Sequence, residues 1–260
     1  MTAVLPDLGS EVRAALGTVV DPELDEPITD LGFVRSVSVD GSSVEVHLRL
    51  PTSFCAPNFA YLMASDAHDA VAAVPGVERV IVELDDHHDS DLINRGLAAG
   101  AGYRGTFGHE AEESLDELRA TFSRKAHTAA MERAVTGLLR ADRSLEETDV
   151  VDLALGDLPP GDPATEALLR RRATVGLPLD PAAPVLVDAD GTRPSRQTAA
   201  LFLRKARSVR ISVDGNAHFC RGLLRTRYPG SDSDQIPRAD DETTTRPLLP
   251  LLTDPKGSRS

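Results

Sequence analysis

Residues 44–57 have the sequence VEVHLRLPTSFCAP, and this stretch decides the fold of the first third of the chain. From Val44 to Leu50 apolar and polar side chains alternate, which predicts a strand with one buried face. Pro57 suits the first turn of a helix, where the missing N–H of proline costs nothing. Cys55 is therefore expected at a strand-to-helix junction. Free backbone N–H groups at a helix start favour a thiolate, which makes Cys55 a candidate functional thiol.

Cys55 is one of only two cysteines among the 260 residues. Two cysteines far apart in the sequence do not indicate a disulfide framework, so a reduced protein is expected. Free cysteine is among the most buried residue types, and a small buried hydrophobe is the alternative role for Cys55. The hydroxyls of Thr52 and Ser53 are available to bind a thiolate or to cap the following helix.

The segments around this stretch complete a unit with the order helix, strand, strand, helix, strand. The predicted elements are a helix over 10–16, strands over 33–39 and 44–50, a helix over 58–74 and a strand over 77–84. Asp40-Gly41 is a hairpin signal between the first two strands. The fold class is therefore predicted as α+β, with a small α/β sandwich-like domain over residues 1–90.

The rest of the chain has a different composition. Residues 91–109 are rich in glycine, which predicts a linker. Residues 110–228 are expected to form a helix-rich accessory domain, an α/β module with short strands over 184–188 and 209–213. Residues 229–260 are rich in Ser, Asp, Thr and Pro, and we expect a disordered tail.

The charge is concentrated in the first segment. The net charge is −13, and residues 1–91 hold 17 acidic against four basic side chains. This acidity argues against nucleic-acid binding. The basic residues between Arg204 and Arg227 predict a solvated helix face rather than a phosphate site. No apolar run approaches the ~20 residues that span a bilayer. The first residues lack the features of a signal peptide, so we expect no membrane association and a cytoplasmic location.

Two acidic motifs precede the cysteine. They are Asp21-Pro22-Glu23 and, nine residues later, Asp30-Leu31-Gly32. Each alone is typical of an ordinary turn with solvated acids. Their order and spacing relative to Cys55, however, form a combined pattern.

This pattern resembles the metal–sulfur (iron–sulfur) cluster assembly factor family, the SufT/PaaD-like domain, over about residues 9–86. The resemblance implies an accessory or maturation factor, not an enzyme, that assists assembly of an iron–sulfur or iron centre in a client. Cys55 matches the reactive cysteine of the family, and Thr52 matches a nearby threonine. The remaining matches are Asp21 and Glu23 in the first motif and Asp30 and Gly32 in the second. The family cysteine is directly followed by proline, whereas Ala56 intervenes here.

The resemblance also implies cofactors and partners. An iron–sulfur cluster takes four protein ligands, which a single thiolate does not supply. Cys55 would therefore bind iron or a cluster transiently, either as a metal ligand shared in a homodimer or during transfer. Asp21 and Glu23 would suit iron as a harder ion. The expected partners are a client metalloprotein and other iron–sulfur assembly proteins, with an iron-dependent multicomponent monooxygenase as the narrower client.

Two other functions stay open. A thiol-dependent enzyme using Cys55 would need a general base, and His47 would serve only if its strand face turns toward the loop. A metal-free scaffold subunit of an oxygenase complex is the other. Residues 87–89 (His-His-Asp) are expected as a polar turn more than as metal ligands. His218 and Cys220, two positions apart, would point to different faces of a helix.

Overall fold

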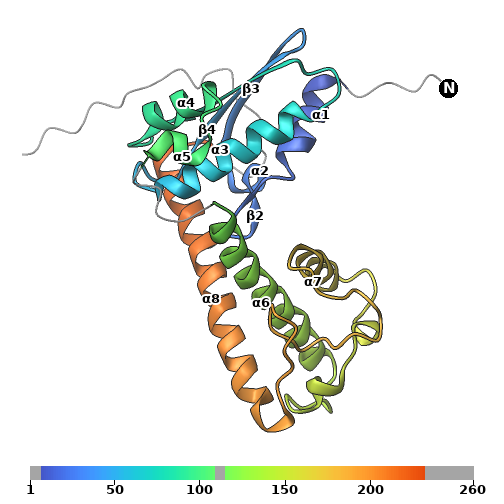
Figure 1. The fold of residues 1–260 in the computed structure, drawn as a ribbon. Coiled ribbons are helices and arrows are strands. Elements are labelled where there is room, and N and C mark those ends of the chain that lie inside the picture. The colour runs from blue at the N-terminus through green and yellow to red at the C-terminus, as the bar shows by residue number, and fades with distance from the viewer. Residues whose placement is uncertain (1–6, 109–114, 232–260) are drawn as a thin grey trace, which may run out of the picture.

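The N-terminal domain contains the predicted helix, two strands, helix and strand in that order, and three short elements that were not predicted lie after the first helix. The computed structural model describes residues 7–108 and 115–231 (Figure 1). The sheet has the order β3-β4-β5, with β3 and β4 antiparallel and β4 and β5 parallel. A separate two-stranded ribbon pairs β1 with β2. The elements are α1 (Leu8–Leu16), β1 (Val20–Asp21), β2 (Glu26–Pro27), α2 (Ile28–Leu31), β3 (Val34–Asp40), β4 (Ser43–Arg49), α3 (Pro57–Ala72) and β5 (Arg79–Asp85).

Alternation along β4 builds the core of this domain. Val44, Val46 and Leu48 are buried, whereas the side chains between them are exposed or half-buried. Helices α1 and α3 cover the sheet (Figure 1) and bury apolar side chains such as Leu16 and Val71 against it. The parallel β4–β5 pair needs a crossover connection, which α3 supplies. The α+β prediction is confirmed, and this arrangement places the Cys55 loop at the end of β4.

The glycine-rich segment is not a linker without structure. It contains α4 (Ser90–Ala98) and α5 (Gly102–Phe107), and the rings of Tyr103 and Phe107 pack on Tyr61 of α3. Gly96 explains why the glycine-rich composition wrongly predicted a linker. A Cβ atom at position 96 would lie 2.1 Å from Oγ1 of Thr106, so glycine here permits close packing of two helices rather than flexibility.

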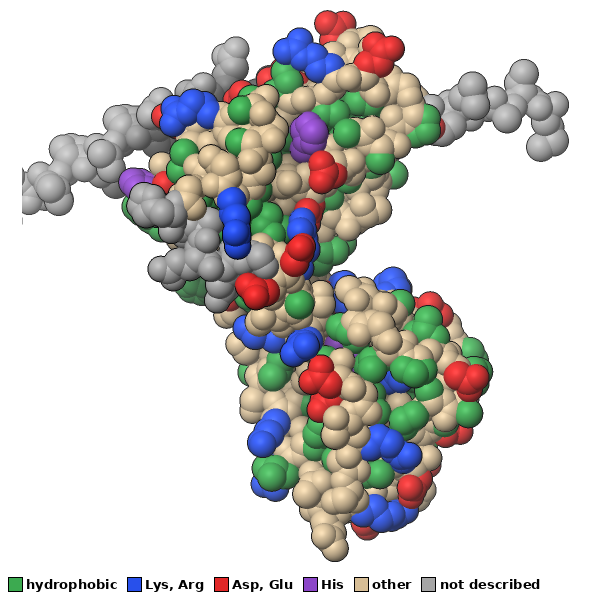
Figure 2. Space-filling view, in the orientation of Figure 1, with side chains coloured by type: hydrophobic (Ala, Val, Ile, Leu, Met, Phe, Trp, Pro, Cys, Tyr) green, Lys and Arg blue, Asp and Glu red, His purple; other side chains and the backbone are tan. Residues whose placement is uncertain are grey.

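The C-terminal part is a helical lobe, which Figure 2 shows joined to the first lobe at a waist. Its two long helices, α6 and α8, lie side by side (Figure 1). Leu168, Val185 and Leu203 lie in the centre of its own core. The elements are α6 (Leu115–Ala141), the 3-10 helices η2 (Asp149–Asp152) and η3 (Leu155–Asp157), α7 (Pro163–Thr174) and α8 (Arg196–Arg227).

The two strands predicted in this lobe do not form. Residues 209–213 lie inside α8, because Val213 is buried at helical spacing with Ala206 and Ala217 and not on an alternating strand face. Residues 184–188 make a single isolated bridge, between Pro184 and Ala154. Within the described residues the C-terminal lobe is therefore helical, without a sheet.

A buried carboxylate joins α6 to α8. Glu132 is fully buried and accepts hydrogen bonds from the Nε atoms of Arg207 and Arg210 and from the hydroxyl of Thr136. Burial alone would raise the pKa of Glu132, but these hydrogen bonds outweigh it and hold the pKa below its ordinary value. Two arginines of the predicted solvated basic face thus pair with a buried acid.

Helix α8 belongs to both lobes. Its C-terminal residues Ala217 and Leu224 are buried in the core of the N-terminal domain. The tail predicted over 229–260 lies outside the described residues from position 232 onward. Across residues 7–108 and 115–231, no helix combines the length and apolar content that crossing a bilayer requires.

Candidate functional site around Cys55

The Cys55 thiol lies in the loop between β4 and α3 and is half-buried. Its Sγ atom lies 3.5 Å from Oγ1 of Thr52, and the same Oγ1 accepts a hydrogen bond from the backbone N–H of Phe54. The Thr52 hydroxyl therefore contacts both the loop backbone and the sulfur, and either the hydroxyl or the thiol can be the donor in the second contact. Ala56 is the N-cap residue and Pro57 begins α3, so Cys55 lies one residue before the N-cap and two residues before the first helical residue.

His87 holds the backbone of this loop. Its Nε2–H donates to the carbonyl oxygen of Cys55 at 2.8 Å, and its Nδ1 accepts from the N–H of Asp89 at 3.0 Å. These two partners define a neutral ring with the proton on Nε2. The N–H of His88 also donates to the carbonyl of Ser53. The segment after β5 thus supports the thiol loop. The sequence predicts a solvated polar turn over residues 87–89, but His87 is buried because both its ring nitrogens bind backbone groups.

The first acidic motif forms a tight turn. One oxygen of the buried Asp21 accepts the backbone N–H groups of Glu23 and Leu24, both at 2.8 Å. Burial raises the pKa of Asp21 to about 6, although these two hydrogen bonds lower it, and the charge of Glu23 adds to the rise. The carboxylate of Glu23 accepts a hydrogen bond from Asn216 of α8 at 3.1 Å. Asp21 therefore organises the backbone of the loop, and Glu23 contacts α8.

The second motif supports the fold near the site. Gly32 ends α2 with φ of 88°, a conformation that favours glycine, and its carbonyl accepts from Nε of Arg49 at 3.2 Å. Asp30 is exposed and accepts a hydrogen bond from the neighbouring Thr29 hydroxyl. Among the described residues no hydrogen bond joins Asp30 to the Cys55 loop.

Comparison with known proteins assigns the N-terminal domain. The model of a family described as iron–sulfur cluster assembly protein matches residues 10–84. An uncharacterized protein of Methanocaldococcus jannaschii is 36% identical over 88 residues, which are 34% of this chain and 90% of that protein. The chain belongs to the iron–sulfur cluster assembly protein family.

Two further relatives of this family member are named as iron–sulfur cluster carrier proteins. The protein of Mycobacterium tuberculosis strain H37Rv is 43% identical over 81 residues, and that of Mycobacterium leprae is 39% identical over 80 residues. In both cases the match covers 30% of this chain and 20% of the relative. The chain thus spans about a fifth of the length of these carriers, and helices α6 to α8 lie outside the family model.

The C-terminal end of α8 binds the family domain at the Cys55 loop. Arg227 donates to the carbonyl of Leu50 at 3.1 Å, to the hydroxyl of Ser53 at 2.8 Å and to the carbonyl of Asp86 at 2.5 Å. The hydroxyl of Tyr228 donates to the carboxylate of Asp86 at 3.0 Å. Sequence reasoning missed these contacts because they join positions more than 140 apart and have no local pattern.

Cys220 approaches the site from the same helix. It is half-buried and packs against the core of the N-terminal domain, as Cys55 does. Burial raises the pKa of the Cys220 thiol to about 11, and the nearby charges of Asp21, Cys55 and Glu23 act in the same direction. The second cysteine therefore lies on a helix that contacts the acidic loop through Asn216 and the thiol loop through Arg227.

Neither of two histidines near this region is placed to activate Cys55. The Nδ1 of His47 lies 2.9 Å from Asp85 and its Nε2 lies 3.0 Å from Glu45. Both ring nitrogens of His87 are engaged with backbone groups. Burial lowers the pKa of His47, but hydrogen bonds to its two carboxylate partners outweigh this and raise it. His47 is thus paired with Asp85 across the sheet. The hypothesis of a thiol-dependent enzyme therefore lacks the general base that it requires for Cys55.

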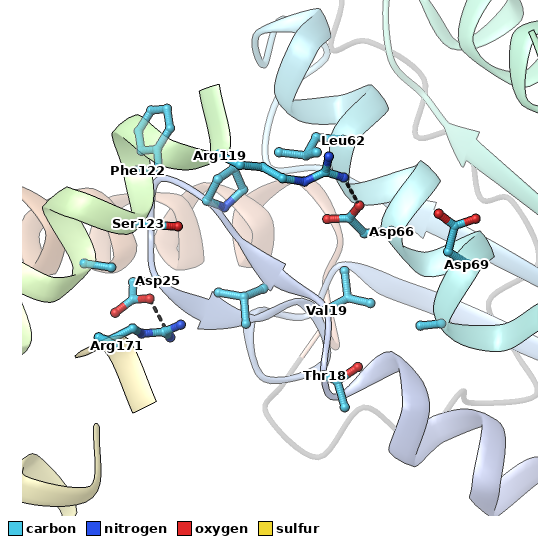
Figure 3. A pocket seen from close by; sticks show the side chains of 14 residues that line it. Thr18, Val19, Asp25, Leu62, Asp66, Asp69, Arg119, Phe122, Ser123 and Arg171 are labelled. Carbon is cyan, nitrogen blue, oxygen red and sulfur yellow. Dashed lines mark hydrogen bonds and ion pairs between the residues drawn. The ribbon is translucent and has the colours of Figure 1, made fainter. Parts of the chain in front are cut away.

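A pocket of about 370 Å³ lies between the two lobes (Figure 3). It contains two ion pairs, one between Arg119 and Asp66 and one between Arg171 and Asp25. Each arginine is neutralised by a carboxylate from the N-terminal domain, so the pairs join the lobes. Cys55 does not line this pocket. The pocket therefore lies at the interface between the lobes and is separate from the thiol loop.

Proposed function

We propose that this protein is a non-enzymatic maturation factor that transfers iron or an iron–sulfur cluster to a client metalloprotein. The observation that carries the proposal is the Cys55 thiol, held beside the Thr52 hydroxyl in a family whose relatives include named cluster carriers. Thiolate is a ligand for iron–sulfur clusters. The cluster is the cargo, bound for transfer and then released.

The surface next to Cys55 supports contact with another protein. Phe54 is 81% exposed, and its ring lies 5.8 Å from the ring of His88. Exposed aromatic side chains are enriched where proteins bind one another. A donor or client that docks on this aromatic pair would bring its own ligands to the thiol. We propose other iron–sulfur assembly proteins as donors and a second copy of this chain as an alternative source of ligands.

The narrower client that we propose is an iron-dependent multicomponent monooxygenase, in the cytoplasm. Co-expression with such an enzyme is expected to raise its iron content, and the Cys55→Ser variant is expected to remove that gain. Equal iron content with both forms would exclude this client.

The general proposal is tested by cluster transfer. The full chain is reconstituted anaerobically with ferrous iron and sulfide and mixed with an apo-ferredoxin, whose visible circular dichroism reports the cluster received. Cys55→Ser is expected to slow transfer by about tenfold or more, by loss of a ligand. Ser212→Ala on the exposed face of α8 is the control. Equal transfer by Cys55→Ser and the parent would contradict the proposal and favour a metal-free scaffold.

A further inference from the structure

The two cysteines of the chain pack against one hydrophobic core, Cys55 from the loop between β4 and α3 and Cys220 from the C-terminal part of α8. Cys55 and Cys220 both pack against the same core, and both are half-buried. Neither forms a disulfide. Partial exposure distinguishes both from a cysteine that only fills a core.

The face of α8 that carries Cys220 is fixed by its neighbours. Ala217 and Leu224 lie three residues before and four residues after Cys220, and both are buried in the core of the N-terminal domain. Residues at these spacings share one helix face, so the Cys220 side chain points toward the N-terminal domain. His218 is exposed on another face, as its two-residue offset predicts.

Two hydrogen-bonded contacts bracket Cys220 along the helix. Asn216, one turn before it, binds Glu23 of the acidic loop at 3.1 Å. Arg227, two turns after it, binds Ser53 of the thiol loop at 2.8 Å. An ion pair between Arg221 and Glu26 adds a third contact beside it. A helix rises ~1.5 Å per residue, so Cys220 lies within about 10 Å along the axis of both contacts.

We propose that Cys220 is the second thiolate of the Cys55 site, so that one chain holds iron, or one iron of a cluster, through two sulfurs. The inference rests on the proposed function, in which Cys55 alone supplies too few ligands for iron, and it identifies a second ligand. When the metal binds, two S–Fe bonds form, both thiol protons pass to water, and two exchangeable ligands leave the iron. No change of oxidation state is needed.

The partial ligand set suits transfer. No group of three or more His, Cys, Asp or Glu side chains within the described ranges could hold a metal ion alone. Iron bound by thiolates is tetrahedral, so two thiolates leave two positions of a single iron for a donor or client. In a two-iron cluster bridging sulfide fills those two positions, and the second iron stays open to the ligands of the partner. Cys220 also gives α8 a role that the N-terminal domain alone could not provide, since this helix lies outside the family model.

The first test uses the unmodified full chain. Under anaerobic conditions Co²⁺ serves as a probe for ferrous iron, and iodoacetamide labelling is followed at each cysteine by peptide mass spectrometry. Protection of Cys55 and Cys220 together, at one Co²⁺ per chain, is the expected result. Protection of Cys55 alone would overturn the role of Cys220 and leave the proposed function intact. Protection of neither would count against both.

The second test counts sulfur–metal bonds. The near-ultraviolet charge-transfer absorption of the cobalt complex is expected to fall to about half in Cys55→Ser and in Cys220→Ser, and to vanish in the double variant. Ser212→Ala is the control on the same helix, and far-ultraviolet circular dichroism checks folding. Full absorption in Cys220→Ser would overturn the inference. Full absorption in both single variants would also contradict the role of Cys55 as a metal ligand in the proposed function.

Discussion

His87 donates its Nε2 proton to the carbonyl oxygen of Cys55 across 2.8 Å. The ring is buried, and its other nitrogen accepts the N–H of Asp89. A neutral imidazole with one donor and one acceptor therefore joins the end of β5 to the loop that carries the thiol. His87 acts on Cys55 through its backbone carbonyl and not through its sulfur.

Replacing His87 tests this support. His87→Ala removes the hydrogen bonds of the buried ring to the carbonyl of Cys55 and to the N–H of Asp89, so we expect the free energy of unfolding to fall by about 1–3 kcal/mol. Iodoacetamide should also label Cys55 faster. Chemical denaturation and labelling rates measure the two effects. His88→Ala, which removes an exposed ring, is the control and should change stability by no more than about 0.5 kcal/mol. Equal effects of the two variants would refute the assigned role.

Gly96 and Gly137 test whether the glycine-rich segment is packed. An added Cβ at Gly96 meets Thr106 at 2.1 Å, whereas one at Gly137 in α6 meets nothing within 4 Å. Gly96→Ala should therefore destabilise the N-terminal domain by about 1–3 kcal/mol through overpacking. Gly137→Ala should stabilise α6 by about 0.5–1 kcal/mol. Thermal unfolding measures both, and a neutral Gly96→Ala would restore the linker interpretation.

The sequence predicted what depends on local pattern. Alternation from Val44 to Leu50 fixed the central strand, and the acidic and cysteine motifs located the loops of the site. Arg227 and its three acceptors could not be found, because a contact over 174 positions leaves no periodic signal. The alternation of Val209, Ile211 and Val213 predicted a strand because every second residue is apolar, yet only Val213 is buried. Tertiary packing of α8 decided its helical state.

Glu132 should make the helical lobe sensitive to acid. Its pKa is held below the ordinary value in the folded chain. The stabilisation is therefore present above its unfolded pKa and is lost as the pH falls through the folded pKa. Glu132→Gln weakens the bonds to Arg207 and Arg210 and should cost about 1.5–3 kcal/mol at pH 7, with less effect in acid. Denaturant melts at several pH values measure this, with the exposed Glu166→Gln as control. A pH-independent loss would contradict the charge argument.

Asp21 should behave in the opposite sense. Its folded pKa of about 6 exceeds the ordinary 3.8, so the folded chain binds the proton more tightly than the unfolded chain. The stability gained from the neutral form is complete below about pH 4 and is lost as the pH rises through about 6. Asp21→Asn keeps an oxygen acceptor for both backbone N–H groups and should stabilise the protein at pH 7.5 by about 2–3 kcal/mol.

The Asp21→Asn gain should disappear near pH 4, which thermal melts at both pH values would measure. The exposed Asp30→Asn is the control and should show no such pH dependence. If the carboxylate also helps to hold iron, the more stable variant should transfer less cluster, a trade-off typical of functional sites. Equal stability of Asp21→Asn and the parent at pH 7.5 would show that burial does not perturb this acid.

Arg227 should control access to the thiol. Its guanidinium binds two carbonyls and one hydroxyl around the Cys55 loop, so Arg227→Ala removes three hydrogen bonds at once. We expect the free energy of local opening of the last turns of α8 to fall by about 1–3 kcal/mol. Hydrogen exchange should then rise over 216–228, and alkylation of Cys55 should accelerate.

Arg227→Lys keeps the charge but loses the planar guanidinium. Its rates of hydrogen exchange and of Cys55 alkylation should lie between those of the parent protein and those of Arg227→Ala. Arg225→Ala, which removes an exposed side chain two residues earlier, is the control. If Arg225→Ala and Arg227→Ala open the helix equally, the contact with Ser53 does not hold α8 over the site.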